Sequence, residues 1–219
     1  MHWSTSTEYG KPGGILYLEG TPTDLLLGHH ARTKEEFIQW NETRQFDKLF
    51  RFVDYVPGDF IHIPANTLHS FRIRGIMIAF ARNSDVTLRL YDYDRIGKDG
   101  KKRELHIDKA LDVADLHGSA EPRQPLRVLK YRPGMASELL IRCKYFEVYR
   151  MLINTERRQT VHYRADRMAF RVLLCMDGCG TISYDEGTVN FYKGDCVFVP
   201  ADSEVLTIHG QAQFLDIRG

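Results

Sequence analysis

Short apolar runs, often alternating with polar residues, follow one another along most of the 219-residue chain. This spacing is typical of β-strands, and Gly and Pro separate the runs as turns between strands require. In the first half, strands are predicted at residues 15–18, 25–27, 52–56, 60–63, 70–73, 76–80 and 88–93. A second strand-rich block runs from 139 to 217. The pattern therefore predicts a mainly β protein.

Helical patterns are few and short. Thr33 precedes Lys-Glu-Glu-Phe, and Glu36 follows it three residues later, which is the pattern of a capping box at a helix start. The polar stretch between Trp40 and Phe50 predicts a second short helix. Residues 105–113 predict a third. We therefore expect a few short helices beside the first block of strands.

Two stretches of the chain repeat the same order of turn and strand signals. Residues 57–69 read PGDFIHIPANTLH, and residues 193–205 read KGDCVFVPADSEV. In both, Gly-Asp predicts a turn, the alternating segment predicts a half-buried strand, and Pro-Ala with Asn or Asp predicts the next turn. This recurrence indicates two related β units. We expect a first domain at 1–117, a proline-containing linker at 118–133 and a smaller second domain at 134–219.

Composition and charge exclude several classes of function. The chain has 30 Lys and Arg against 29 Asp and Glu, so its net charge is +1. This balance gives no basic footprint, and we expect no nucleic-acid partner and no binding to an anionic membrane. No apolar run reaches the ~20 residues of a membrane span, and the N-terminus lacks the pattern of a secretory signal. The expected location is the cytoplasm, with the four cysteines as reduced thiols.

The first copy of the repeat carries a motif that is known from one superfamily. Residues 58–69 contain Gly-x5-Pro-x-Asn-x2-His, which ends at His69. This resembles the second motif of the cupins, small jelly-roll barrels in which the His is a metal ligand. NSDVTLRLYDYDR at 83–95 and RELHIDKALDV at 103–113 resemble the bacterial class I mannose-6-phosphate isomerases, zinc cupins that interconvert mannose 6-phosphate and fructose 6-phosphate. The resemblance spans 9–219 and implies two cupin-like jelly-roll units.

The same resemblance implies a zinc ion held by four side chains, of which only His69 has a counterpart in this chain. The family's metal-binding Glu falls on Gly13, and a further acidic residue falls on Ala79. The N-terminal section with the Gln and His ligands has no counterpart. A catalytic zinc needs about three protein ligands and an open position. We therefore expect an N-terminally shortened relative with a degenerate metal site.

Two arginines match the family pattern near the substrate. Arg89 falls on the catalytic arginine position, and Arg95 falls on a basic position near the sugar phosphate. Arginine binds phosphate bidentately, so both residues favour a phosphorylated hexose as the partner. The alternative is that they are strand-edge charges paired with nearby aspartates. The charge run Lys98, Lys101, Lys102 and Arg103 is predicted to be a solvated turn.

Two functional hypotheses follow. In the first, the protein is a non-catalytic or altered cupin that binds a sugar phosphate through Arg89, Arg95 and His69. In the second, it is an active zinc-dependent isomerase whose metal site is completed by a separate chain or rebuilt from other histidines. The candidates for the rebuilt set are His62, His69, and His29 or His30.

Each of these histidines also has a structural interpretation. His69 would be a residual barrel-facing side chain, and His62 would be an ordinary strand residue. His29 and His30 would lie in a surface turn. In the second copy of the repeat, Val205 stands at the position of His69, so we expect no metal there. The second domain would then be structural or form a homodimer.

Overall fold

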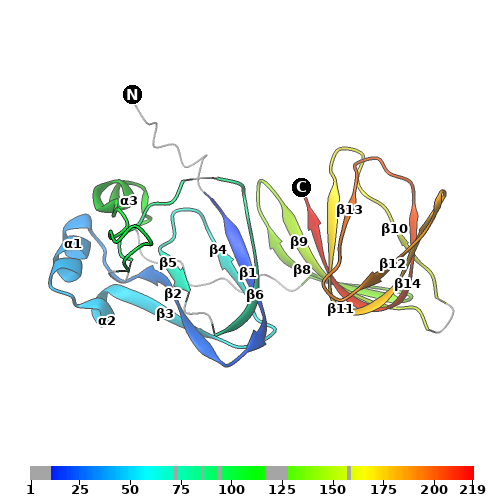
Figure 1. Ribbon diagram of the computed structural model, residues 1–219, viewed down its shortest axis with the longest axis horizontal. Coiled ribbons are helices and arrows are strands. Elements are labelled where there is room, and N and C mark those ends of the chain that lie inside the picture. Colours follow the sequence, from blue (N-terminus) through cyan, green and yellow to red (C-terminus); the bar gives the residue numbers. More distant parts are fainter. Residues whose placement is uncertain (1–10, 72–73, 85, 93–94, 117–127, 157–158) are drawn as a thin grey trace. The chain divides into compact units, whose positions relative to one another are not determined.

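The computed structural model describes residues 11–71, 74–84, 86–92, 95–116, 128–156 and 159–219. The chain divides into two compact units, residues 1–123 and 124–219. Antiparallel strands outnumber helices in both units, and the described helices are short (Figure 1), which confirms a mainly β fold. Within the described part of the chain, no helix is long and apolar enough to span a membrane.

The first unit contains two small antiparallel sheets. One has the strand order β4-β1-β6 and the other β3-β2-β5. Apolar side chains from both sheets pack into one core cluster, which includes Ile15, Leu25, Ile61 and Ile63. The strands are β1 (Gly13–Gly20), β2 (Thr23–His29), β3 (Phe50–Tyr55), β4 (Phe60–Ile63), β5 (His69–Phe71) and β6 (Gly75–Ala81).

A helical layer belongs to this unit and has its own apolar cluster, formed by Ala31, Phe37, Trp40, Leu49 and Leu111. The helices are α1 (Lys34–Glu42), α2 (Phe46–Leu49) and α3 (Ile107–Val113). All three predicted helices are therefore confirmed, with α3 starting later than expected.

The start of α1 shows why the sequence encodes a helix there. The hydroxyl of Thr33 accepts a hydrogen bond from the backbone N–H of Glu36 at 3.1 Å, as the capping pattern predicts. The carboxylate of Glu36 accepts from the N–H of Arg32 at 2.8 Å, one residue before the position usual in a capping box. The first bond satisfies an N–H group that the first helical turn leaves without an intrahelical partner, and the second holds the residue before the N-cap.

The prediction of a strand at 88–93 is wrong for the described part of that range, because residues 88–92 do not form a strand. The carbonyl of Asp92 accepts from the N–H of Arg95 at 3.1 Å, so the chain turns here. Leu90 packs against the helical layer. Leu90 is thus partly buried by the helical layer and not by pairing with a neighbouring strand, and Tyr91 is exposed.

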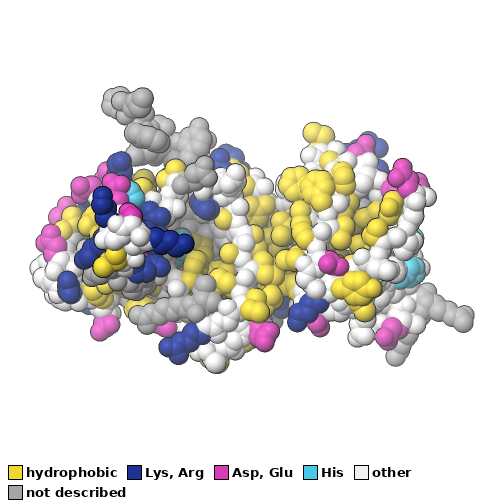
Figure 2. Space-filling model, viewed as in Figure 1, with side chains coloured by type: hydrophobic (Ala, Val, Ile, Leu, Met, Phe, Trp, Pro, Cys, Tyr) yellow, Lys and Arg dark blue, Asp and Glu magenta, His cyan; other side chains and the backbone are white. Residues whose placement is uncertain are grey.

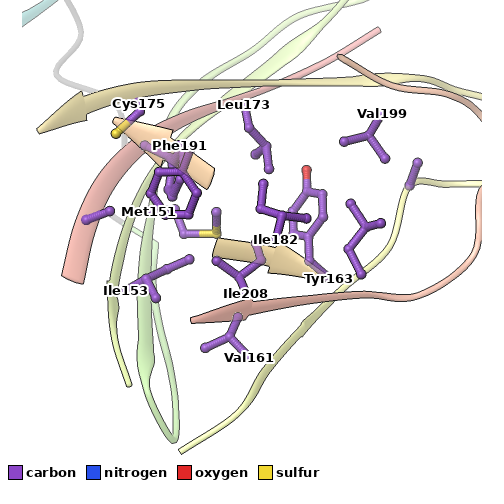
Figure 3. Packing of buried hydrophobic residues seen from close by; sticks show 14 residues of the cluster. Met151, Ile153, Val161, Tyr163, Leu173, Cys175, Ile182, Phe191, Val199 and Ile208 are labelled. Atoms are coloured by element: carbon purple, nitrogen blue, oxygen red, sulfur yellow. The ribbon is translucent and has the colours of Figure 1, made fainter. Parts of the chain in front are cut away.

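The second unit is a larger antiparallel sheet with strand order β12-β11-β14-β9-β8-β7. In addition, β10 pairs with β14, and β13 pairs with β11. Its strands enclose one large apolar cluster (Figure 3). The strands are β7 (Leu129–Arg132), β8 (Met135–Arg142), β9 (Glu147–Asn154), β10 (Val161–Tyr163), β11 (Arg171–Tyr184), β12 (Gly187–Tyr192), β13 (Cys196–Val199) and β14 (Leu206–Arg218).

The predicted linker at 118–133 is too long at its C-terminal end. Residues 129–132 form β7, which pairs with β8. All four residues of β7 are exposed, so no buried apolar face marks this strand in the sequence. Residues 118–127 of the expected linker lie outside the described residues.

The repeated Gly-Asp turn has the same geometry in both units. The carboxylate of Asp59 accepts from the N–H of Val56 at 2.9 Å. In the second unit, the carboxylate of Asp195 accepts from the N–H of Tyr192 at 2.8 Å. The preceding glycines both have a positive φ, +98° and +96°, which a residue with a Cβ rarely adopts. The sequence repeat therefore corresponds to a structural repeat.

The turn is also tied to equivalent strands. The N–H of Gly58 donates to the carbonyl of Tyr17 on β1 at 2.7 Å, and the N–H of Gly194 donates to the carbonyl of Cys175 on β11 at 2.8 Å. Tyr17 and Cys175 consequently mark equivalent positions in the two units.

Candidate functional site

A buried carboxylate in the first unit holds two arginines. The side chain of Asp92 is 8% exposed. Its Oδ1 lies 2.5 Å from Nη2 of Arg95, and its Oδ2 accepts from Nε of Arg103 at 2.7 Å. Arg103 also donates from Nη2 to Oδ1 of Asp92. These contacts, first that with Arg103 and then that with Arg95, lower the pKa of Asp92 to about 2, so the carboxylate is ionised at neutral pH.

Both guanidinium groups of this trio reach solvent. The side chain of Arg95 is 61% exposed and that of Arg103 is 45% exposed. Figure 2 shows Lys and Arg side chains gathered on the visible face of the first unit, around α3 and the loop before it. The trio carries a net charge of +1, and one carboxylate fixes the positions of both cations. We call Asp92, Arg95 and Arg103 the arginine clamp.

The sequence pattern identified only part of the clamp. Pairing of Arg95 with an aspartate is the alternative that the sequence left open, and the structure shows this pair. Arg103, expected in a solvated turn, is exposed, but its guanidinium also binds the buried Asp92, which the sequence did not indicate. No local pattern joins residues 11 positions apart in a loop, so the contact depends on the tertiary fold.

Arg89 lies on the same segment and is half-buried. Its N–H donates to Nδ1 of His106 at 3.3 Å, and the N–H of His106 donates to the carbonyl of Arg89 at 2.7 Å. This reciprocal pair ties the segment to the residue just before α3. Arg89 and the clamp are therefore parts of one loop that is fixed at two points.

His69 lies on the face of β5 that points toward the core of the first unit, but the residue is exposed. On β5 it shares a face with Phe71, which packs against the barrel core, and the two rings are 5.4 Å apart. Nδ1 of His69 lies 2.9 Å from the carbonyl oxygen of Thr67. In the tautomer that makes this hydrogen bond, Nδ1–H is the donor and Nε2 carries the lone pair. His69 can therefore accept a hydrogen bond or bind a cation through Nε2.

His62 lies on the face of β4 that points away from the core of the first unit. Its neighbours Ile61 and Ile63 belong to the barrel core, so alternation directs His62 outward. Its Nε2 is buried without a hydrogen-bond partner among the described residues. Burial lowers the pKa of His62 and favours the neutral ring. His62 and His69 therefore do not face the same space.

His29 is not in a surface turn, contrary to expectation. It is 2% exposed and is the last residue of β2. The pairing of β2 with β3 shifts register between Leu26 and His29. Its Nε2 lies 2.9 Å from the carbonyl oxygen of Asp115, and its ring packs edge-on against Phe37 at 5.4 Å. His30 is exposed, as expected. His29 thus joins the sheet to the helical layer.

The described residues do not fit a zinc site. Among residues 11–116 and 128–219, apart from the short gaps, no group of three or more His, Cys, Asp or Glu is placed to hold a metal ion. A Cβ on Gly13 would lie 2.8 Å from the carbonyl oxygen of Phe80 and 3.0 Å from Cβ of Ala81. The position that the resemblance gives to a metal-binding Glu is therefore closely packed around a glycine.

Comparison with known proteins gives consistent matches. The family model described as "Mannose-6-phosphate isomerase, cupin domain" matches residues 136–218. Mannose-6-phosphate isomerase ManA of Bacillus subtilis is 31% identical over 193 residues. The crystal structure of the mannose 6-phosphate isomerase from Bacillus subtilis has a TM-score of 0.85 at 28% identity, and the match covers 95% of this chain and 64% of that one.

A zinc-bound mannose 6-phosphate isomerase structure has a TM-score of 0.67 at 14% identity, covering 94% of this chain and 65% of that one, which shows a shared fold. The match to ManA covers 87% of this chain and 58% of ManA, so the chain spans little more than half the length of that relative.

Proposed function

The chain belongs to the mannose-6-phosphate isomerase family of cupins, and from this premise we propose that it binds a phosphorylated hexose without the family's zinc-dependent isomerisation. The arginine clamp carries this proposal. Its two guanidinium groups are held on one buried carboxylate before any ligand arrives. Such preorganisation reduces the entropy lost when an anion binds.

The charge and geometry of the clamp suit a phosphate group. Each guanidinium carries several N–H donors in a fixed planar fork. The net charge of +1 attracts an anion, and both side chains extend into solvent. Phosphate accepts several charge-assisted hydrogen bonds at once, which two neighbouring guanidinium groups can supply.

The remaining candidate residues have simpler roles in this proposal. His69 would accept a hydrogen bond from a sugar hydroxyl through Nε2, at the core-facing side of β5. Arg89 would add a further positive charge on the loop that carries the clamp.

Moving a proton between C1 and C2 of a sugar also requires a base and an electrophile that polarises the carbonyl. The described residues do not group into a metal-assisted set of this kind.

A second candidate function is an active isomerase whose metal site is completed by residues outside the described ranges or by another chain. The hydrogen bond between Nδ1 of His69 and a backbone carbonyl favours it. Metal-binding histidines commonly make such a bond, because it orients the ring and leaves the other nitrogen for the metal. His62 is a poor member of a rebuilt set with His69, since it faces outward.

Calorimetric titration with mannose 6-phosphate and fructose 6-phosphate tests the proposal. We expect saturable binding by the wild type and about tenfold weaker binding by Arg95→Gln, because a charge-assisted contact is lost. Lys98→Gln is the matched control, since it removes an exposed charge from the same loop. Absence of binding by the wild type, or equal losses in both variants, would contradict a role for the clamp.

A further inference from the structure

The second unit carries charged residues where the first unit carries small ones. Counting back four residues from Tyr17 on β1 reaches Gly13, and counting back four from Cys175 on β11 reaches Arg171. Gly13 pairs with the last residue of β4, and Arg171 pairs with the last residue of β13. Gly13 and Arg171 are therefore equivalent positions of the structural repeat.

The next strand shows the same replacement. In the first unit, the β6 residues that pair with Gly13 and Ile15 are Ala81 and Ala79, and both are exposed. In the second unit, the matching positions on β14 are Asp216 and Arg218, and Arg218 lies directly opposite Arg171. Two arginines thus face each other across an antiparallel pair, an arrangement that is unfavourable unless an anion lies between them.

Asp216 supplies part of that negative charge from inside the barrel. It is 1% exposed and accepts from the hydroxyl of Tyr163 at 2.7 Å. Arg218 donates to its Oδ2 from Nε at 3.1 Å and from Nη2 at 2.7 Å. Arg171 reaches the same oxygen from Nη1 at 3.4 Å, a longer contact. Tyr163 belongs to the apolar cluster in Figure 3, so the carboxylate is anchored to the core.

One carboxylate does not balance two guanidinium groups. Within the described part of this unit, a second acidic residue near the two arginines is Glu147, whose Oε2 lies 4.0 Å from Nη1 of Arg218. Glu147 is already bound by Arg142 and by the hydroxyl of Tyr149. Nε of Arg171 is buried and has no hydrogen-bond partner among the described residues. Arg171 is therefore the arginine of the pair whose positive charge is least neutralised by nearby carboxylates.

The two guanidinium groups are held in place and accessible from one end. Arg171 lies over the ring of Tyr163 at 5.3 Å, and Arg218 lies over the ring of Tyr149 at 3.9 Å. Their side chains are 16% and 30% exposed, whereas Asp216 is buried. An anion from solvent can therefore reach both cations without displacing the carboxylate beneath them.

We propose that the second unit binds a phosphate-type oxyanion between Arg171 and Arg218, at the end of the barrel where Asp216 anchors both side chains. The oxyanion supplies the negative charge that the pair lacks, and it accepts parallel hydrogen bonds from the two guanidinium groups. This site is independent of the arginine clamp, which lies in the other unit.

Nuclear magnetic resonance tests this site directly, because the buried Nε–H of Arg171 gives its own signal. Inorganic phosphate is titrated into the wild-type protein at constant ionic strength, with potassium chloride as the balancing salt. We expect the signal to shift and to saturate with phosphate, and to shift less with acetate. No shift, a shift that does not saturate, or equal saturation by acetate would overturn the proposal.

Variants separate this site from the first unit. Arg171→Lys keeps the positive charge but removes the planar guanidinium with its paired N–H donors. We expect this variant to bind phosphate about tenfold more weakly, with binding measured through the Nε–H signal of Arg218. Arg167→Gln is the matched control and should bind as the wild type does, because Arg167 is exposed and contacts Asp202 and not Asp216. Arg95→Gln should leave the Arg171 shift unchanged. If Arg171→Lys does not fold, the wild-type titration still decides the question.

Discussion

The two units start from the same Gly-Asp turn and equivalent strand pairings, yet they use their interiors differently. The first keeps an imidazole, His69, on the core-facing side of β5 and has a separate helical layer. The second has Val205 at the position of His69 and closes around one large apolar cluster with Asp216 at its edge. The turn and register therefore specify the barrel, and a few interior positions decide which chemistry the barrel can hold.

The largest expected effect comes from the core of the second unit. Phe214 is fully buried, so Phe214→Ala should lower the free energy of unfolding by about 3–5 kcal/mol. Urea unfolding followed by circular dichroism measures this loss. Phe198→Ala is the control, because that side chain is 61% exposed and its loss should cost about 0.5 kcal/mol or less. Equal effects of the two variants would contradict the observed packing.

The charged cluster gives the next effect. Asp216→Asn leaves Arg171 and Arg218 facing each other without the carboxylate, and we expect a loss of about 3 kcal/mol in the free energy of unfolding. The reverse substitution at the equivalent place, Ala79→Asp, should change the stability of the first unit little, because Ala79 is exposed and the new carboxylate would be solvated. Urea unfolding of both variants checks this contrast. A neutral effect of Asp216→Asn would show that the carboxylate does not hold the arginines.

The helical layer of the first unit depends on its caps. Thr33→Ala removes the hydroxyl that accepts from the N–H of Glu36 and should cost about 1 kcal/mol. Thr33→Ser keeps the oxygen and should retain most of the stability. Thermal unfolding of the two variants makes the comparison, and equal losses would mean that the hydroxyl does not cap α1.

The smallest effect is a pH dependence at His62, whose equivalent in the second unit is Phe198. Burial lowers the pKa of His62 below its ordinary value of 6.5. Below pH 6.5 the unfolded chain therefore binds a proton that the folded chain resists, and stability falls as the pH decreases toward the lowered pKa. His62→Phe should remove this part of the pH dependence of the melting temperature. An unchanged pH profile would contradict burial of the neutral ring.

Much of the fold could be predicted from local patterns. The Gly-Asp repeat and the cap at Thr33 depend on residues close together in the sequence, so their patterns are visible there. Strand β7 was missed because its residues are all exposed. The run at 88–92 was misread as a strand because its alternation reflects the packing of Leu90 against the helical layer and not strand pairing.

The candidate site was less predictable for a similar reason. The family resemblance identified Arg95 and His69 as candidates, but the clamp also needs Asp92 and Arg103, which meet through a loop. The burial of His29 follows from the helical layer above it and has no local signature. Close packing around Gly13 is equally a property of the assembled sheet.

The most direct test of the proposed function combines binding and turnover in one sample. Mannose 6-phosphate is titrated into the protein with zinc present, and fructose 6-phosphate is followed by a coupled assay while elemental analysis measures bound metal. The account predicts saturable sugar-phosphate binding, no bound zinc and no conversion. Steady conversion that His69→Ala abolishes, with zinc bound to the wild type, would contradict it.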